Sequence, residues 1–506
     1  MLVPACRPAG APAPQGPVRV VLQGPVASLD PTLSEPRALA VLANVFEPLV
    51  AYDRNLQLRP SLAIRWETPD ETTWLFTLRP GVTFHDGSPL DAAAVVESLE
   101  RARSTDDSNA RGALWAVSRV EAVGADTVRI ATRAPDALLL HELTLPLVAR
   151  GGSRAAVEAR PIGTGPYRVV SWTRKGALEL EAWDRHWGGV PPVRRLRVLP
   201  LPAGADPVLA ISRGDADAAE VPLSAARRNP PAGVRFFTQP GLTTFYLWMN
   251  GPAEVEGRPN PFWDVRVRRA AARAIDRARL ALEATGTRST AAPQLVPRTV
   301  FGHVGSIAPL PFDPAAARAL LQATGRTLPV EATLVYREDG GTERAARLLK
   351  EMLDAAGFSI TVRAVAGSEV QRVVLAGRLT LFLGGWVFDG PDAGGFLRDC
   401  IRSRDASDRT GLFNPGYRDL EIDRLVDASH AAFSRSDRLA LLEEAIRLAT
   451  EDAPLVPLYH RPDAWAVSER LDWSPRPDGR FLASEIGAAK GSAERLRPAR
   501  RSDLGS

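Results

Sequence analysis

Residues 76–91 read FTLRPGVTFHDGSPLD, and two turn dipeptides divide this stretch. Before the first turn, apolar side chains occupy every second position from Trp74 to Leu78, a period of two that predicts a β-strand. Pro80-Gly81 and Asp86-Gly87 then favour tight turns, so the chain between them should form a short hairpin-like excursion. A helix is expected to begin at Ser88–Asp91. The stretch therefore predicts a strand that leads through a bent connection into a helix.

Strand-length apolar runs and helix-length segments alternate along the rest of the chain. Strands are expected at 18–22, 127–131, 178–182, 193–199, 234–238, 243–249, 358–363 and 381–383. Helices are expected at 39–50, 264–282, 313–325 and 342–357 and from residue 436 onward, several of them after an Asp or Ser cap. The alternation shows no sequence repeat, and it predicts an α/β architecture.

The composition is that of a globular protein. Of 506 residues, 45% are hydrophobic and 24% charged, which suggests two to four domains and excludes a disordered, fibrous or disulfide-stapled chain. The positive charge lies at the ends, because residues 488–506 hold five basic and two acidic residues and Arg7 adds one more. Residues 8–487 are therefore neutral, and no nucleic-acid partner is indicated. No apolar stretch approaches the roughly 18 residues that span a bilayer.

Local catalytic signatures do not occur in the sequence. It contains no Gly-rich loop with Lys-Ser/Thr, no His-Glu-x-x-His, no Gly-x-Ser-x-Gly and no closely spaced cysteine pair. Six histidines are present, and no two have the spacing of metal ligands, so no metal or other cofactor is predicted. His85-Asp86 could be a base with its orienting carboxylate. A surface turn is the simpler interpretation, because Asp-Gly supplies the backbone geometry.

Besides residues 76–90, five shorter motifs occur in order along the chain. They are SLDP at 28–31, VFEPLV at 45–50, LRPSLA at 58–63, GTGPY at 163–167 and RVRRAAARAIDR at 266–277. In this order they resemble family 5 of the bacterial ABC-transporter solute-binding proteins, the peptide/nickel group that includes oligopeptide- and dipeptide-binding proteins. The resemblance extends from about residue 18 to 485, and six motifs in sequence make chance a poor explanation. Their glycines and prolines are expected to shape the fold rather than to touch a ligand.

The resemblance implies an α/β fold of the periplasmic-binding-protein class II, a clamshell of two lobes with an additional domain in the first. Mapped onto this chain, residues 1–17 would be a leader or tether. Lobe I would combine 18–45, 160–250 and 455–487, with the additional domain at 46–159, and lobe II would be 251–454. Residues 488–506 would be a polar, disordered tail. Chain crossings near residues 250 and 454 would form the hinge.

The resemblance also suggests where a ligand binds. In peptide-binding relatives an Asp that follows a strand and a Trp pairs with the ligand's terminal ammonium, and Gly384-Gly385-Trp386-Val387-Phe388-Asp389 matches that pattern. Asp389 is thus the first candidate, through a charge-assisted hydrogen bond; the alternative is that it caps the following turn. Trp386 and Phe388 would be apolar walls, with core packing the stronger alternative for Phe388. Asp392-Ala393 stands where relatives have Asp-Pro, which leaves the loop's shape open.

Two further ligand-binding candidates come from neighbouring segments. Glu35 follows Asp30-Pro31, in the segment that lines the cleft in relatives, and surface exposure is the equal alternative. Arg337 follows the strand expected at 332–336, near where dipeptide-binding relatives place an arginine for the ligand's carboxylate. A planar guanidinium suits this role because it forms two parallel hydrogen bonds.

The function implied is that of a non-enzymatic, periplasmic or otherwise extracytoplasmic component of an ABC importer. It would be a monomer that captures short peptides and delivers them to a membrane permease with ATPase subunits. Alternative cargoes are a nickel chelate, a sugar or another small solute. An enzyme that uses paired carboxylates from distant segments stays open, and so does a sensory or scaffold protein that serves no transporter.

The first residues leave two alternatives for the cell envelope. Val3-Pro4-Ala5-Cys6 resembles the end of a lipoprotein signal, with Cys6 as the lipidated residue, although Pro4 fits poorly and the preceding charged and apolar regions are missing. Either the natural start lies upstream, or the similarity is a coincidence. The only other cysteine is Cys400.

Overall fold

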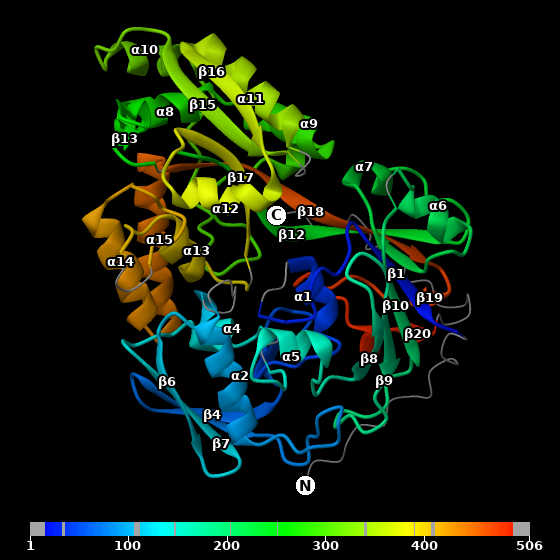
Figure 1. Ribbon diagram of the computed structural model, residues 1–506. Coiled ribbons are helices and arrows are strands. Elements are labelled where there is room, and N and C mark those ends of the chain that lie inside the picture. The colour runs from blue at the N-terminus through cyan, green and yellow to red at the C-terminus, as the bar shows by residue number, and fades with distance from the viewer. Residues whose placement is uncertain are drawn as a thin grey trace, which may run out of the picture.

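A ten-stranded mixed sheet runs through the protein and joins its upper and lower halves (Figure 1). The computed structural model describes residues 16–32, 36–105, 112–145, 148–202, 204–249, 251–338, 342–388, 390–405 and 410–488. The order across the sheet is β16 (Phe358–Val365), β15 (Val330–Arg337), β17 (Leu381–Val387), β12 (Val234–Trp248), β18 (Leu455–Ser468), β11 (Ala218–Glu220), β1 (Val18–Leu22), β10 (Arg195–Pro200), β9 (Leu178–Ala182) and β8 (Tyr167–Trp172).

The two central strands, β12 and β18, are much longer than the others, with 15 and 14 residues. They pair antiparallel from Val234–Ser468 to Trp248–Leu455, with a register shift between Gln239 and Thr243. On one side β12 pairs with β17, and on the other side β18 pairs with β11. The two halves of the sheet are therefore held together through this one pair of strands.

Residues 63–132 form a sheet of their own, in the order β4 (Ala63–Asp70), β5 (Thr73–Leu78), β7 (Thr127–Thr132) and β6 (Val117–Val123). Burial alternates along β5, which confirms the strand predicted from residues 74–78. The carboxylate of Asp91 caps α2 (Ala92–Ser104) by accepting a hydrogen bond from the amide of Ala94 at 2.8 Å. A separate hydrophobic core lies between these strands and α2. It includes Val82, Phe84 and Leu90 from the connection between β5 and α2.

Helices flank the large sheet, and short elements connect them (Figure 1). We call the part of the protein on the β11 side of the central strand pair the lower half; it holds α1 (Pro36–Leu42), α4 (Leu139–Glu142), α5 (Arg154–Ala159), α6 (Pro207–Ser212), α7 (Leu223–Ala226) and the strands β2 (Val50–Tyr52), β3 (Leu58–Pro60), β19 (Leu471–Asp472) and β20 (Gly487–Ala488). The part on the β17 side is the upper half; it holds α8 (Val265–Ala274), α9 (Arg277–Thr285), α10 (Pro314–Gln322), α11 (Glu343–Ala356), α12 (Gly367–Leu375), α13 (Gly394–Cys400), α14 (Leu420–Ala431), α15 (Arg435–Asp452) and the hairpin of β13 (Glu254–Val255) and β14 (Arg258–Pro259). Single turns of 3-10 helix lie at Pro261–Trp263, Arg288–Thr290 and Ala483–Glu485.

The helix predicted for residues 39–50 is wrong in its extent, because α1 ends at Leu42. The cause is Asn44, which is fully buried and bonds to backbone groups. Its amide nitrogen donates to the carbonyl oxygens of Val41 and Phe481 at 2.8 and 2.6 Å, and its oxygen accepts from the amide of Ala483 at 2.8 Å. A side chain that competes for backbone groups in this way ends a helix and here ties it to the C-terminal segment.

The helix predicted for 264–282 is two helices. Ile275 adopts an extended conformation after α8, and Asp276 caps α9 by accepting from the amide of Arg279 at 2.9 Å. The strands predicted at 234–238 and 243–249 are, conversely, one strand with a bulge. The apolar pattern continues through Ile275 and so did not show the break, whereas Gln239-Pro240-Gly241 interrupts the pattern between the two predicted strands and concealed their fusion.

Gly163 and Gly165 allow two parts of the chain to touch. A Cβ atom on Gly163 would overlap the carbonyl oxygen of Val45 and lie 2.8 Å from the Phe46 ring, and one on Gly165 would lie 2.5 Å from the oxygen of Asn44. His85 stabilises this segment, because its Nε2 donates to the Gly165 oxygen at 2.9 Å and its Nδ1 accepts from the Gly163 amide at 3.3 Å. His85 is therefore a buried structural residue, and the interpretation of His85-Asp86 as a catalytic pair is not supported.

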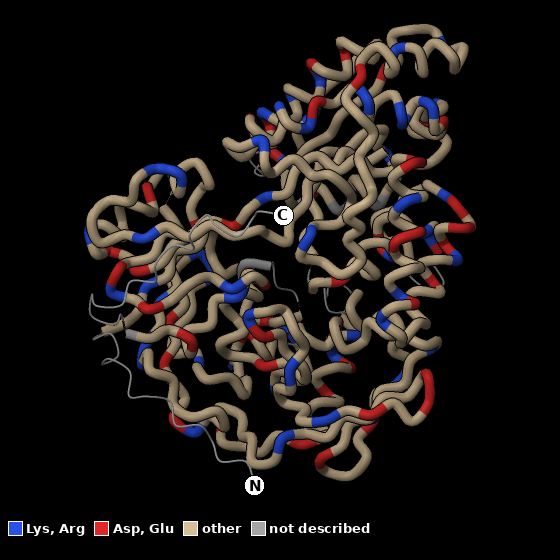
Figure 2. Tube along the Cα trace, turned by 180° about the vertical axis from the view of Figure 1, so that it is seen from behind, with Lys and Arg blue, Asp and Glu red and all other residues tan. Residues whose placement is uncertain are grey.

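Charged residues are distributed over the whole molecule. Seen from behind in Figure 2, basic and acidic residues are interspersed along the chain rather than gathered on one face. Many of them pair locally, as Arg447 does with Glu444 and Glu451. Within the described ranges, no helix is both long enough and apolar enough to cross a membrane.

We expect Gly163→Ala to destabilise the protein by about 3 kcal/mol or more, because the new methyl group would overlap the backbone carbonyl of Val45 and force the backbone to shift. Urea unfolding measures the change. The matched control is Gly305→Ala, where nothing lies within 4 Å of the added atom, and its effect should stay within about 1 kcal/mol. Equal effects of the two substitutions would contradict the close-contact explanation.

We expect His85 to make stability depend on pH between 4 and 6.5. Burial lowers the pKa of His85 from 6.5 to about 4. Between these two pH values the unfolded chain binds a proton at His85 that the folded protein does not bind. The free energy of unfolding is therefore unaffected by titration of His85 above pH 6.5 and decreases as the pH falls toward 4. The decrease from pH 7 to pH 5 is about 2 kcal/mol. Urea unfolding of His85→Gln at both pH values should show a slope smaller by that amount, and an unchanged slope would refute the assignment.

Candidate ligand-binding pocket

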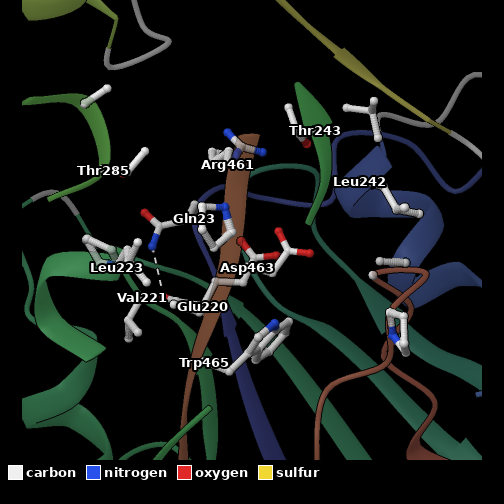
Figure 3. Close-up of a pocket in the computed structure, with 18 of the residues that line it drawn as sticks. Gln23, Glu220, Val221, Leu223, Leu242, Thr243, Thr285, Arg461, Asp463 and Trp465 are labelled. Carbon is white, nitrogen blue, oxygen red and sulfur yellow. Dashed lines mark hydrogen bonds between the residues drawn. The ribbon is translucent and has the colours of Figure 1, made fainter. Parts of the chain in front are cut away.

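One pocket of about 820 Å³ lies where the two halves of the large sheet meet (Figure 3). Its lower wall comes from the ends of β1 and β11, from α1 and α7, and from the C-terminal residues 477–480. Its upper wall comes from the last turn of α9, the first turn of α11 and the end of β17. Between these walls lie residues 242–243 of β12 and residues 461–465 of β18. Volume and position are those of a small-molecule site.

The bulge in β12 shapes the middle of the pocket. After Gln239 the strand leaves its register with β18 and resumes it at Thr243, so Leu242 and Thr243 reach the pocket. Gly241 makes the close approach possible, since a Cβ atom there would overlap the oxygen of Arg461 and lie 3.2 Å from Oδ1 of Asp463. Bulges commonly redirect side chains beside functional sites in this way.

Two acidic residues and a tryptophan line the lower part of the pocket on one face of the sheet. Glu220 of β11 pairs directly with Trp465 of β18, and Asp463 lies two residues from Trp465, so all three side chains point to the same side. Figure 3 shows Glu220 and Asp463 on the pocket side of these strands, between Trp465 and Arg461. Burial raises the pKa of the Asp463 carboxyl, and the positive charge of Arg461 offsets this only in part.

The C-terminal part of the lower wall is held in place by Arg476, whose side chain is 3% exposed. Its guanidinium donates to Asp478 at 2.9 Å, to Glu485 at 2.6 Å and to the carbonyl oxygen of Tyr52 at 2.8 Å. Arg480, two residues beyond Asp478, donates to the carbonyl oxygen of Thr144 at 2.6 Å. The segment that lines the pocket is therefore fixed to the region that contains β2 and α4.

Contacts between the upper and lower parts enclose the pocket from two directions. Beside α7, the guanidinium of Arg227 donates to the carbonyl oxygen of Gly286, a residue that itself lines the pocket. Beside α4, the buried pair Glu142–Arg398 closes at 2.6 Å. These contacts join segments that are distant in sequence and hold the upper and lower halves together on two sides.

The predicted apolar walls lie in different surroundings. Phe388 lines the pocket but is only 2% exposed, with its ring 5.3 Å from that of Phe396, so it packs in the core as well. Trp386 is partly buried and packs edge-on against Phe396 and Phe413 at 5.9 and 5.5 Å, and it is not among the pocket residues. Whether either side chain touches a ligand stays a prediction.

The other predicted site residues are not tested by the structure. Asp389, Glu35 and Cys6 lie outside the described residues. Arg337 is exposed at the end of β15, and it does not line the pocket. These residues stay predictions.

The loop beyond Asp389 is fixed by a buried ion pair. Asp392 accepts from Arg438 at 2.7 Å and from the Gly394 amide at 2.8 Å, and Arg438 also donates to the oxygen of Ser429 at 3.0 Å. Burial opposes ionisation of Asp392, but the hydrogen bonds and charge of Arg438 outweigh it and lower the pKa of the carboxyl. A Cβ atom on Gly390 would lie 2.5 Å from the hydroxyl of Tyr52, so this loop also packs closely against the lower half. The loop that contains Asp392-Ala393, where relatives have Asp-Pro, is thus held in place by buried contacts.

Sequence reasoning missed Glu220, Asp463, Arg461 and Trp465. Glu220 ends a three-residue strand, and Asp463 ends the polar stretch His460-Arg461-Pro462-Asp463, in which a proline hides the continuous strand. Only the pairing of β11 with β18 brings them together. The one sequence signal that could have raised attention is this polar stretch, which interrupts an otherwise apolar segment.

The described residues show no group of three or more His, Cys, Asp or Glu side chains placed to hold a metal ion. The pocket is lined by no histidine. Its polar groups are carboxylates, guanidinium groups, hydroxyls, the amide of Gln23 and backbone groups, which suit hydrogen bonding to a charged organic solute.

Comparison with known proteins identifies the family. Residues 57–408 match the family described as "Bacterial extracellular solute-binding proteins, family 5 Middle". The chain therefore belongs to family 5 of the bacterial extracellular solute-binding proteins, and the resemblance seen in its motifs is confirmed. It is a solute-binding protein of the class that serves ABC importers, with the α/β two-lobed fold of that class.

Individual relatives are distant but cover nearly the whole chain. The glutathione-binding protein GsiB of Salmonella paratyphi A is 25% identical over 458 residues, 85% of this chain and 86% of that protein. Among solved structures, the periplasmic binding protein DppA of Helicobacter pylori, in complex with the peptide STSA, has a TM-score of 0.80 at 19% identity and covers 94% of this chain and 98% of its own. NikA of Staphylococcus aureus, in complex with Ni(L-His)2, has a TM-score of 0.77 at 18% identity, covering 93% and 99%.

We expect Arg476→Met to destabilise the protein by about 3–5 kcal/mol, because it leaves the carboxylate of Asp478 and other buried acceptors without their cation. Urea unfolding with circular dichroism measures the loss. Arg372→Met is the matched control, since Arg372 forms an exposed pair with Glu369 that should contribute less than about 1 kcal/mol. A small effect at Arg476 would show that the C-terminal segment is held in place by other contacts.

Proposed function

We propose that this protein captures short peptides in the pocket between β12, β18 and the two flanking walls. The observation that carries the proposal is the pocket itself: about 820 Å³, between two halves of a family 5 fold, and lined by both carboxylates and guanidinium groups. A short peptide is a zwitterion, so groups of both signs match its two ends. Relatives described as glutathione-binding and di/tripeptide-binding proteins support the same cargo.

The lobes proposed are those expected from the sequence, with lobe I at 18–45, 160–250 and 455–487 and lobe II at 251–454. Strand order supports this division outside the central pair, because β1 and β8 to β11 lie on one side of β12 and β18, and β15 to β17 lie on the other. The separate sheet of residues 63–132 supports an additional domain at 46–159. The hinge is proposed at the chain crossings near residues 250 and 454, just after the end of β12 and just before the start of β18.

In this mechanism, backbone pairing and terminal-charge recognition capture the peptide, and the lobes then close over it. Asp389 is proposed to bind the terminal ammonium, with Glu35 and Trp386 close to the ligand and Arg337 near its carboxylate. The closed monomer would dock on a membrane permease whose ATPase subunits drive import. A lipid on Cys6 would be the means of holding the protein at the cell envelope.

The residues of the pocket fit a peptide better than they fit other cargoes or an enzymatic activity. A nickel chelate is supported by the NikA structure, but the pocket offers no histidine for it. A sugar would leave the charged side chains without partners of opposite sign. The paired carboxylates that an enzyme would need do meet in Glu220 and Asp463, yet they lie in a pocket that spans two halves joined by crossing strands, as solute capture requires.

We expect di- and tripeptides to raise the thermal stability of the purified protein. A ligand that binds only the folded state, at 100 times its dissociation constant, stabilises by about 2.7 kcal/mol, which a thermal-shift measurement detects readily. Asp389→Ala should abolish the shift, because the ammonium would lose its anchor. Glu331→Gln, an exposed carboxylate on β15, is the charge-matched control and should leave the shift intact.

Denaturing mass spectrometry of the gently purified protein identifies what the pocket retains. Peptides in the released fraction support the proposal. A nickel chelate or a sugar released instead would keep the solute-binding protein and refute peptide as its cargo. Absence of any shift with the peptide series would refute it as well.

A further inference from the structure

The lower part of the pocket presents negative charge on an aromatic surface. Glu220 and Asp463 are diagonal neighbours across β11 and β18, on the face that also carries Trp465. Trp465 is 5% exposed, and its ring is packed at 5.2 Å against Trp473 and 6.1 Å against Phe481. The indole therefore has a fixed orientation beside the two carboxylates (Figure 3).

Asp463 differs from the other acidic residues of the pocket in its surroundings. Glu283 forms an ion pair with Arg344, and Asp478 forms one with Arg476 at 2.8 Å. The positive charge that acts on Asp463 is that of Arg461, which is exposed and forms no ion pair with it among the described residues. Among the described residues, Asp463 is thus buried without an ion pair, and burial raises the pKa of its carboxyl although the charge of Arg461 offsets this in part.

The backbone next to Asp463 leaves this carboxylate directed at the pocket. Gly241 lies so close that even a methyl group would come within 3.2 Å of Oδ1, so β12 covers one side of the carboxyl group without adding a side chain. The open side faces the pocket, where a ligand group would meet it. A cation placed there would gain charge-assisted hydrogen bonds to two carboxylates and a cation–π contact with the indole.

We propose that Glu220, Asp463 and Trp465 form a subsite for a positively charged side chain of the captured solute, a primary ammonium or a guanidinium. The inference rests on the proposed function, because it assigns a side-chain specificity to the same pocket. It is separate from the terminal ammonium, for which Asp389 is the proposed anchor. The protein would accordingly prefer peptides that contain lysine or arginine over neutral peptides of equal length.

Titration calorimetry with the full chain tests the preference. The probes are tri-alanine and the three tripeptides in which lysine replaces one alanine, so that the position of the charge is scanned. We expect at least one lysine peptide to bind about tenfold to hundredfold more tightly than tri-alanine, the gain that a hydrogen bond to a charged group supplies. Glu220→Gln and Asp463→Asn, which preserve size, should each reduce this preference to about twofold or less while tri-alanine still binds.

Glu469→Gln, an exposed carboxylate just beyond β18, is the control for a general change in charge, and it should retain the preference. If tri-alanine binds but no lysine peptide binds more tightly, the subsite is refuted and peptide capture stands. If the two substitutions weaken all four peptides equally, the carboxylates bind the terminal ammonium and the side-chain subsite is again refuted. If none of the four peptides binds, the proposed function itself fails, and the subsite fails with it.

Discussion

The pairing of β12 with β18 is the constraint on which the rest of the structure depends. These strands hold both halves of the sheet, since β17 attaches to one and β11 to the other. Because their hydrogen bonds join the two halves of the sheet, the proposed lobe closure would have to come from changes in backbone dihedrals at strand ends rather than from separation of the halves. A bulge near Gln239 relaxes the ladder at that place and opens room for the pocket.

Buried arginines stabilise the surroundings of this pocket. Arg476, Arg438 and Arg398 each join segments far apart in the chain, and each satisfies carboxylates or carbonyl oxygens that would otherwise be buried without partners. A planar group with five donors suits such junctions better than lysine does. The sequence contains very few lysines, and these buried junctions all use arginine.

Much of the fold could be predicted because its signals are local. The alternation in β5, the Asp91 cap of α2 and the Asp313-Pro314 start of α10 depend on neighbouring residues only, and the structure confirms them. The extent of α1 could not be predicted, because Asn44 ends it through bonds to residues more than four hundred positions away. The break at Ile275 was missed for a related reason: the apolar pattern continues on both sides, and only the cap geometry of Asp276 reveals it.

The sequence by itself determined the family, the α/β class and the turns in the motifs, because glycine, proline and capping residues act on the backbone within a few positions. It also pointed to the segment after β17 as part of a ligand site, through a family pattern rather than through physics. Which side chains line the pocket was decided only by tertiary structure. Glu220 and Asp463 are 243 positions apart, and their meeting depends on the register between two strands, a property that no local stretch of the sequence contains.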